Sequence, residues 1–231
     1  MKTQLLLFIA VTVLLAGARV YALPDKTFTS SGQILPGEEW NSVYIYNDDT
    51  IVDMLGGFAE GIGTYDASTV NIIGGHVNTL DATEFSTANV SGGEVYGLWA
   101  EDSGTVKLFP NGTVFSLGAS GSGTTYMTGG TTEYARAGDS SLMHLYGGAI
   151  SNYLNAWDSA TVNIYGYDFN YDPTAGAWNG GQLTGFWLDH APFTIDLYDA
   201  QTYSHITLIP EPNTLIVLAL GALFLTRKKT T

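Results

Sequence analysis

The 231-residue sequence contains no cysteine and only eight lysine and arginine residues, against 22 aspartate and glutamate residues. The absence of cysteine excludes a disulfide-stabilised scaffold, while the length is sufficient for one sizeable core. Between Leu23 and Pro210 the imbalance is sharper, with 21 acidic and three basic residues, an excess of eighteen negative charges. Nucleic acid is excluded as a natural partner, because a phosphate backbone needs a basic face. Solubility outside the cell, cation binding, or a neutral or basic partner remain.

Long apolar runs occur at the two ends of the chain. At the N-terminus, Met1-Lys2 precedes an apolar run from Leu5 to Leu15 and then several small residues. This pattern predicts a secretory signal peptide over residues 1–22, with cleavage after Ala22 or, alternatively, after Ala18. An uncleaved membrane anchor is the weaker interpretation, because the run is shorter than the ~20 apolar residues that a membrane span needs.

The C-terminal end carries three elements in order, which are Pro210-Glu211-Pro212, an apolar run over residues 214–226, and the basic triplet Arg227-Lys228-Lys229. Residues 210–231 resemble the PEP-CTERM sorting signal of exported bacterial proteins. The resemblance implies that a short transmembrane helix holds the precursor in the inner membrane until an exosortase, a processing protease, cuts near the Pro-Glu-Pro. The mature protein would then be at the cell surface or extracellular.

The length of this apolar run suits a transient anchor. Its 13 residues would reach only ~20 Å as a helix, short of a ~30 Å hydrocarbon core. The basic triplet predicts that the body of the protein lies on the outer side of the cytoplasmic membrane. A plain stop-transfer helix is the alternative.

Between the two ends, a motif recurs, of which Asp66 to Gly75 is the clearest copy. It returns at a nearly constant step of about 18 residues. Each copy contains a pair of glycines, which we call the glycine mark and number by its first residue. The mark occurs at Gly56, Gly74, Gly92, Gly129 and Gly147, and other residues replace one or both glycines in the copies at Pro110 and Gly166. Apolar residues dominate the positions four and two before each mark, as in Val70 and Ile72, whereas the residues between them are mostly polar. A second apolar pair follows each mark, as in Val77 and Leu80.

This alternation predicts short strands with one buried face, two per repeat, in repeats too small to fold alone. Antiparallel sandwiches and barrels do not require the same residue type at the same phase of every repeat, whereas stacked coils do. We therefore predict an all-β fold, a parallel β-solenoid (β-helix) of seven ~18-residue coils over residues 48–167, with a right-handed coil favoured. The units are similar to repeat arrays found in exported PEP-CTERM proteins.

The segments that flank the repeats are expected to close the solenoid. Residues 23–47 contain turn signals and one alternating strand, which indicates an N-terminal cap. The period is lost after Tyr167, and residues 168–209 indicate a hairpin with its tip at 189–192 and a last strand from His205. We interpret this segment as a C-terminal β cap that covers the open edge of the last coil.

The most regular polar column lies eight positions before each mark and comprises Asp48, Asp66, Glu84, Asp102, Asp139 and Asp158. One hypothesis is a ladder of Ca²⁺ ions bridging neighbouring coils through carboxylate oxygens. The alternative, which we favour, is that each carboxylate accepts backbone N–H bonds in its turn. We therefore predict no cofactor and no metal site of another kind, since His76, His144, His190 and His205 share no ligand spacing.

No catalytic residue is predicted. Polysaccharide lyases need a cation beside the substrate carboxylate, and the body has only Lys26, Lys107 and Arg136; a hydrolase would need two carboxylates, such as Glu84 with Asp102. Five tryptophans, Trp40, Trp99, Trp157, Trp178 and Trp187, together with many tyrosines, could stack on sugars, although packing is the commoner role. The favoured interpretation is an exported bacterial surface or matrix protein, structural or adhesive, associated with exopolysaccharide. A polysaccharide-active enzyme is the alternative.

Overall fold

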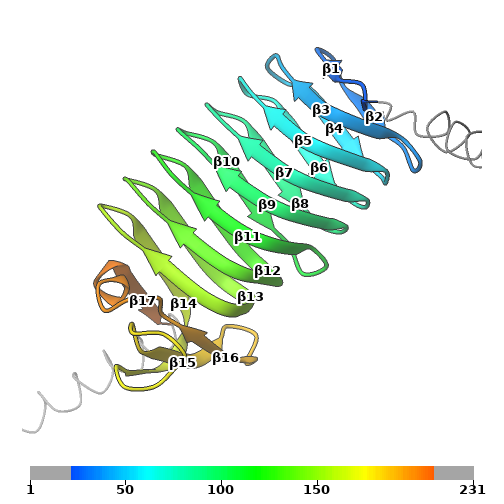
Figure 1. Ribbon diagram of the computed structural model, residues 1–231. Helices are drawn as coiled ribbons and strands as arrows, with labels where there is room; N and C mark the ends of the chain where they lie inside the picture. Colours follow the sequence, from blue (N-terminus) through cyan, green and yellow to red (C-terminus); the bar gives the residue numbers. More distant parts are fainter. Residues whose placement is uncertain (1–21, 211–231) are drawn as a thin grey trace, which may run out of the picture.

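The computed structural model describes residues 22–210 (Figure 1). The predicted signal peptide lies almost entirely outside these residues, as does the predicted sorting segment beyond Pro210, including Glu211, Pro212 and the triplet at 227–229. Within residues 22–210, no helix is long and apolar enough to cross a membrane.

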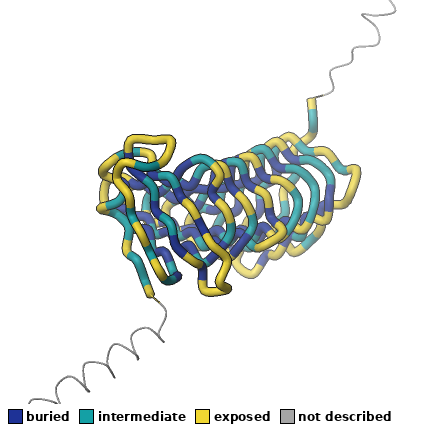
Figure 2. Tube along the Cα trace, turned by 90° about the horizontal axis from the view of Figure 1, so that it is seen from below, coloured by how far each residue is buried: buried dark blue, intermediate teal, exposed yellow. Residues whose placement is uncertain are grey.

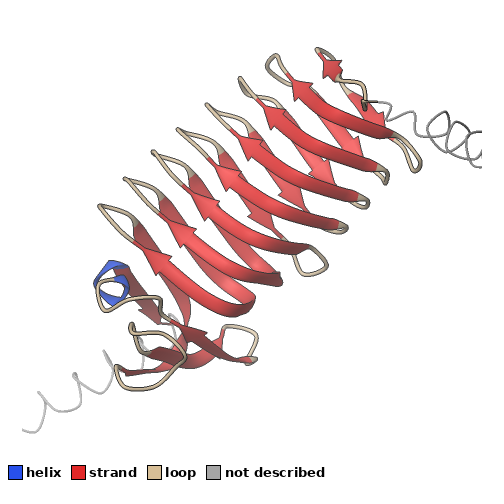
Figure 3. Ribbon diagram, viewed as in Figure 1, coloured by secondary structure: helices blue, strands red, loops and turns tan. Residues whose placement is uncertain are grey.

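The described chain is built from strands, and Figure 3 shows them stacked as successive coils of an elongated body. The strands are β1 (Lys26–Phe28), β2 (Gly32–Ile34), β3 (Glu39–Ile45), β4 (Ile51–Met54), β5 (Phe58–Thr64), β6 (Thr69–Ile72), β7 (His76–Ala82), β8 (Thr87–Val90), β9 (Glu94–Ala100), β10 (Thr105–Leu108), β11 (Thr113–Ala119), β12 (Thr124–Ala137), β13 (Leu142–Ala156), β14 (Thr161–Asp172), β15 (Gln182–Trp187), β16 (Pro192–Asp196) and β17 (Ile206–Pro210). One 3-10 helix, η1 (Thr202–His205), precedes β17.

Each coil consists of a short strand followed by a long one, and each strand pairs in parallel with its counterpart in the next coil. Val52 pairs with Val70 and Val70 with Ala88 along the short strands, while Val77 pairs with Val95 along the long ones. In β12 and β13 the two strands of a coil run together without a break. The predicted parallel β-solenoid is therefore confirmed. Its hand stays a prediction.

The stacking begins earlier than the repeat pattern indicates. β2 pairs with β4 and β3 with β5 in the same parallel register, so residues 32–45 form a coil of their own, and the solenoid has about eight coils instead of seven. Ile34 pairs with Met54, and Met54 pairs in turn with Ile72. The first two residues are farther apart along the chain than the second two. Of the segment predicted as an N-terminal cap, only β1 lies outside this coil, paired with the edge of β3.

The long strand is bent, which gives the coil a third side. Along β7 and β9 the pairing passes from Val77 with Val95 directly to Thr79 with Gly97, and the intervening residues Asn78 and Tyr96 do not pair. The same residue is skipped in the other coils. At this corner the alternation of inward and outward side chains is interrupted, so that two successive inward residues are three positions apart instead of two, as with Val77 and Leu80. This bend explains why the apolar spacing departs from a simple alternation.

The core is a continuous column inside the stacked coils, as the buried segments in Figure 2 show. All fourteen residues at the two inward positions of the short strand are at most 1% exposed. Each buried aliphatic side chain of this kind contributes roughly 1.5–3 kcal/mol of transfer free energy. The glycine marks have a steric cause: Gly75 has φ of +91°, and a Cβ there would lie 2.7 Å from the Gly57 carbonyl oxygen of the preceding coil.

After the last full coil the chain leaves the parallel stack. The first half of β14 pairs in parallel with β13, but its second half pairs with β15 in antiparallel fashion, and β15 with β16. The predicted hairpin is thus present, with its connection at 188–191. β17 returns to lie parallel to β14.

Candidate functional site

The carboxylate column lies at the turns that lead into the short strands. Asp66 is the second residue of a turn closed by a hydrogen bond from the Ser68 N–H to the Tyr65 carbonyl, and it has φ of +55°. Its counterparts Glu84, Asp102, Asp139 and Asp158 have φ values of 52° to 57°. Gly121, which interrupts the column, has φ of +60°. Asp48 is the exception, because its neighbours Asn47 and Asp49 have φ of +74° and +63° while Asp48 itself is not in the left-handed region. At the other positions residue choice follows backbone conformation, since aspartate and glycine tolerate the left-handed region well.

Several of these carboxylates also hold neighbouring coils together. The Asn47 N–H donates to Asp66 at 2.8 Å, the Asp66 N–H donates to Glu84 at 2.9 Å, and the Gly121 N–H donates to Asp139 at 3.0 Å. Asp48 accepts from the Ala67 N–H at 3.2 Å. In most of these hydrogen bonds the donor is a backbone N–H of the preceding coil, not one in the carboxylate's own turn. Within residues 22–210, no group of three or more acidic or histidine side chains is placed to hold a metal, and the calcium ladder stays a prediction.

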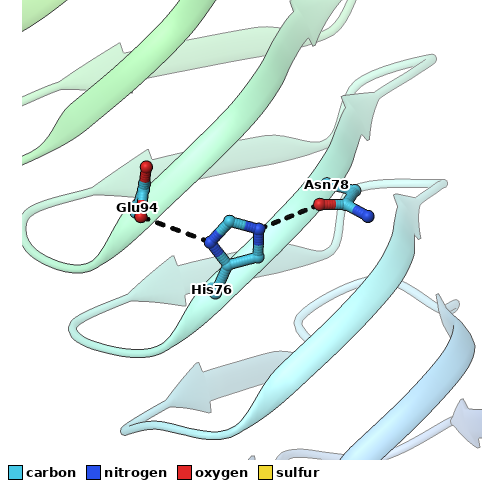
Figure 4. Close-up of polar contacts among 3 residues, drawn as sticks. All are labelled: His76, Asn78 and Glu94. Atoms are coloured by element: carbon cyan, nitrogen blue, oxygen red, sulfur yellow. Dashed lines mark hydrogen bonds and ion pairs between the residues drawn. The ribbon is translucent and has the colours of Figure 1, made fainter.

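The histidines lie in unrelated environments. Figure 4 shows His76 between coils, with Nδ1 3.4 Å from Glu94 Oε2 and Nε2 2.9 Å from Asn78 Oδ1. Elsewhere, His144 stacks among tyrosine rings, and burial lowers its pKa. His190 contacts Tyr167, and His205 lies 3.0 Å from the Ala160 carbonyl oxygen. The structure brings none of the four together.

A groove lies on the outer side of the long strands, with a volume of about 660 Å³. It crosses β7, β9, β11, β12 and β13, a length of about 19 Å at ~4.8 Å per strand. Its lining is mostly aromatic and, apart from one arginine, uncharged; it comprises Thr79, Tyr96, Gly97, Trp99, Phe115, Ser116, Tyr134, Arg136, Asn152, Tyr153, Trp178 and Tyr198. The last two come from the segment after the coils.

The floor of the groove depends on small residues in positions where neighbouring coils carry large ones. Trp99 pairs with Gly118, which in turn pairs with Arg136. The Trp99 indole lies across Gly118 so closely that a Cβ on this glycine would be 2.1 Å from the ring. In the adjacent column, Gly97 precedes Ser116, whose hydroxyl is buried without a hydrogen-bond partner among the described residues.

Aromatic rings form a continuous row along the other side of the groove. Tyr96 stacks on Phe115 with ring centroids 4.3 Å apart, and Phe115 meets Tyr134 edge-on at 5.1 Å. Tyr134 lies 4.8 Å from Tyr153, which contacts both Trp178 and Tyr198. The two ends of the row are open to solvent, with Tyr96 55% exposed. Tyr96 and Phe115 cover each other's inner faces, so the row offers a continuous apolar surface, formed largely by ring edges, against which the C–H faces of sugars can pack.

Arg136 is held between the rings of this row. Its guanidinium lies 5.0 Å from the Tyr134 ring centroid and 5.6 Å from that of Tyr153, and Nη2 donates to Tyr153 Oη at 2.8 Å. Such contacts fix the planar group and leave further N–H donors for a bound ligand. No carboxylate among residues 22–210 forms an ion pair with it.

A perturbed carboxyl group lies beside the groove. Asp81 pairs with Trp99 across β7 and β9. Burial, reinforced by the nearby negative charge of Glu101, raises the pKa of Asp81 to about 6. By contrast, Glu84, part of the carboxylate pair considered from the sequence, is engaged by the Asp66 N–H.

The sequence indicated tryptophans, and tyrosines in general, as sugar-stacking candidates, but it did not single out the particular tyrosines of this row, Arg136 or Asp81 as site residues. The sequence signal for the groove was a break in the columns of equivalent positions in successive coils. Glycine, tryptophan and arginine follow one another there, at positions where a structural ladder would repeat a residue. Trp99 and Trp178 line the groove, while Trp40 and Trp187 pack against or within the core. Comparison with protein-family models, with curated proteins and with solved structures finds no match.

Proposed function

We propose that the protein is a non-catalytic structural or adhesive element of the bacterial surface or extracellular matrix, which binds a polysaccharide in the groove on its long strands. The observation that supports this proposal is the aromatic row that extends from Tyr96 to Tyr198 beside a groove crossing five strands. A rigid stack of coils places these rings at fixed spacing, so a glycan chain would bind with little ordering of the protein.

The proposed location rests on the two ends of the sequence. A signal peptide over residues 1–22 would export the chain. The PEP-CTERM-like segment, Pro210-Glu211-Pro212 with Arg227, Lys228 and Lys229, would anchor it until an exosortase releases it. In this proposal β15, β16 and β17 act as the C-terminal cap, because β17 and the hairpin lie over the end at which another coil would otherwise add.

A binding experiment tests the proposed function. The full-length chain, kept in solution with mild detergent, is run by affinity electrophoresis through gels containing neutral glucan, xylan or alginate. We expect retardation by at least one polymer and about tenfold weaker binding for Trp99→Ala, as for a central aromatic contact. Trp157→Ala is the matched control, since this indole also lies against a glycine, Gly138, but does not line the groove. Equal binding by both variants would refute the groove as the site.

The alternative function is a polysaccharide-active enzyme, and one observation favours it. A carboxyl group with a raised pKa, Asp81, lies next to Trp99 with a second carboxylate, Glu101, nearby. A glycoside hydrolase uses such a group as general acid with the other carboxylate as base or nucleophile. Release of reducing ends from a retained polymer, abolished by Asp81→Asn, would establish this function; retention without cleavage supports the binding protein.

A further inference from the structure

The charges around the groove bear on which glycan fits it. Arg136 is the single charged residue among those that line the groove. The other two basic residues between positions 23 and 210 lie elsewhere: Lys26 contacts Phe28 and Trp40, and Lys107 is on the short strand β10. Although acidic residues outnumber basic ones seven to one in this region, none forms an ion pair with Arg136. The guanidinium is therefore oriented but unneutralised.

The geometry of Arg136 suits a carboxylate ligand. The contacts with Tyr134 and Tyr153 hold its plane, and the bond to Tyr153 Oη uses one of its five N–H donors. Guanidinium groups bind carboxylates through two parallel charge-assisted hydrogen bonds, which are roughly twice as strong as neutral ones.

Acidic residues border the groove and limit how much negative charge it accepts. Glu133 directly precedes Tyr134 in the corner of β12, and Asp81 pairs with Trp99 at the opposite end. Glu94 lies in the first position of β9 and lines a second, smaller hollow of about 260 Å³ together with Glu133 and Phe115. A glycan with a carboxylate on every sugar would place some of them within the field of these groups, where like charges repel.

We propose, on the basis of the proposed function, that the groove binds a glycan whose carboxylates are isolated, with one uronate unit at Arg136 and neutral sugars stacked on the aromatic row. The neutral units supply apolar faces for the rings, and the single carboxylate fixes the position of the chain along the groove. This assignment makes Arg136 a specificity-determining residue.

Three probes of equal length test this assignment on the full-length chain by isothermal titration calorimetry. They are a neutral glucose hexasaccharide, the same hexasaccharide with one internal glucose oxidised to glucuronate, and hexaglucuronate. We expect the singly charged probe to bind about tenfold more tightly than the neutral one, and hexaglucuronate to bind more weakly than the singly charged probe. Arg136→Gln should remove the tenfold preference and change binding of the neutral probe by less than about twofold.

Two variants separate this role from packing and from overall charge. Arg136→Lys keeps the charge but loses the planar fork, so it should keep part of the preference. Lys107→Gln removes one positive charge from a short strand and should leave all three affinities unchanged. Melting temperatures of all variants report any loss of folding.

The possible outcomes are distinguishable. Equal binding of neutral and singly charged probes, or tightest binding of hexaglucuronate, would overturn the inference while leaving the proposed function in place. An equal loss of preference in Lys107→Gln would also overturn it, because the effect would then be one of net charge. If none of the probes binds and the polymer gels show no retardation, both proposals fail.

Discussion

The outer sides of the short and long strands are built on the same stacked backbone but differ in what their side chains do. On the short strands β4, β6 and β8, similar polar side chains form a ladder: Asn89 donates to Asn71 at 2.9 Å, and Asn71 donates to Asp53 at 2.8 Å. On the long strands, successive coils carry different residues, with Trp99, Gly118 and Arg136 following one another in one column. A ladder satisfies its own hydrogen bonds, whereas a column of unlike residues leaves space and unpaired groups.

This difference separates architecture from function within one repeat protein. Where the sequence keeps the period, side chains hold coils together or fill the core. The groove lies where small and aromatic residues replace the repeated ones, although the backbone of the coils continues there without interruption. The two sides should therefore respond differently to substitution, and the predictions that follow are ordered by the size of the expected effect.

The largest effect is expected in the core beneath the short strands. Ile72 is fully buried and belongs to the inward column with Met54 and Val90. Ile72→Ala should reduce the free energy of unfolding by about 2–5 kcal/mol, because it removes buried methyl groups and leaves a cavity. Chemical denaturation followed by circular dichroism measures this loss. Glycan binding below the melting transition should be unchanged, and a parallel loss of binding would contradict the separation of the two sides.

A smaller effect is expected in the carboxylate column, whose turns join the long strand of one coil to the short strand of the next. Asp102 has φ of +52°. Asp102→Val should cost about 1–2 kcal/mol, since a β-branched residue is disfavoured in the left-handed region, whereas Asp102→Gly should be nearly neutral. Gly121 in the same column is the natural precedent for the glycine variant. Thermal unfolding of the two variants beside the parent chain measures the difference.

The same variants distinguish a turn from a calcium site. If the column serves the backbone alone, millimolar Ca²⁺ should not change the melting temperature of the parent chain. A rise in melting temperature with Ca²⁺ that is lost in Asp102→Gly would instead establish the calcium ladder, because the glycine keeps the turn and removes the ligand.

The repeat made the architecture predictable from the sequence. Positions four and two before each glycine mark are inward because a strand alternates and coils stack like on like, and every such residue, including Val70 and Ile72, is buried. The first coil was missed because its step to the next coil is longer than the repeat, with Pro36-Gly37 before the long strand in place of a double glycine. The periodic rule fails where a turn changes length.

The groove was not predictable in the same way. Phe115 is the unpaired corner residue of β11, and Tyr134 is the residue after the corner in β12. The bend in the long strands brings these two side chains into contact. Arg136 was counted as one of three basic residues, and its significance depends on Tyr153 from the next coil and on the absence of acidic partners among the described residues. The break in the columns marks where the groove lies, but side chains that do not repeat have no fixed partner from coil to coil, so the sequence does not predict which of them are in contact.

The smallest effect is expected for Asp81, at the border of the groove. Because burial and Glu101 raise its pKa to about 6, the folded state binds a proton more tightly than the unfolded chain, whose aspartate pKa is ~3.9. This contribution to stability is fully present below pH ~4 and is lost as the pH rises through about 6. Above that pH the ionised carboxylate costs about 1 kcal/mol or less, since solvent screens a partly exposed group.

Asp81→Asn should therefore stabilise the protein slightly at pH 7 and flatten the pH dependence of stability between about pH 4 and 6. Melting temperatures recorded in steps across this range measure both effects. Glu60→Gln is the control, because it removes an exposed carboxylate from the corner column of β5, and it should leave the shape of the profile unchanged. If Asp81→Asn destabilises the chain at pH 7, the ionised carboxylate has a favourable partner, and its place beside Trp99 would then be structural. If it stabilises the chain and leaves glycan binding intact, Asp81 borders the groove without belonging to it, and the part of β7 that lines the groove ends at Thr79.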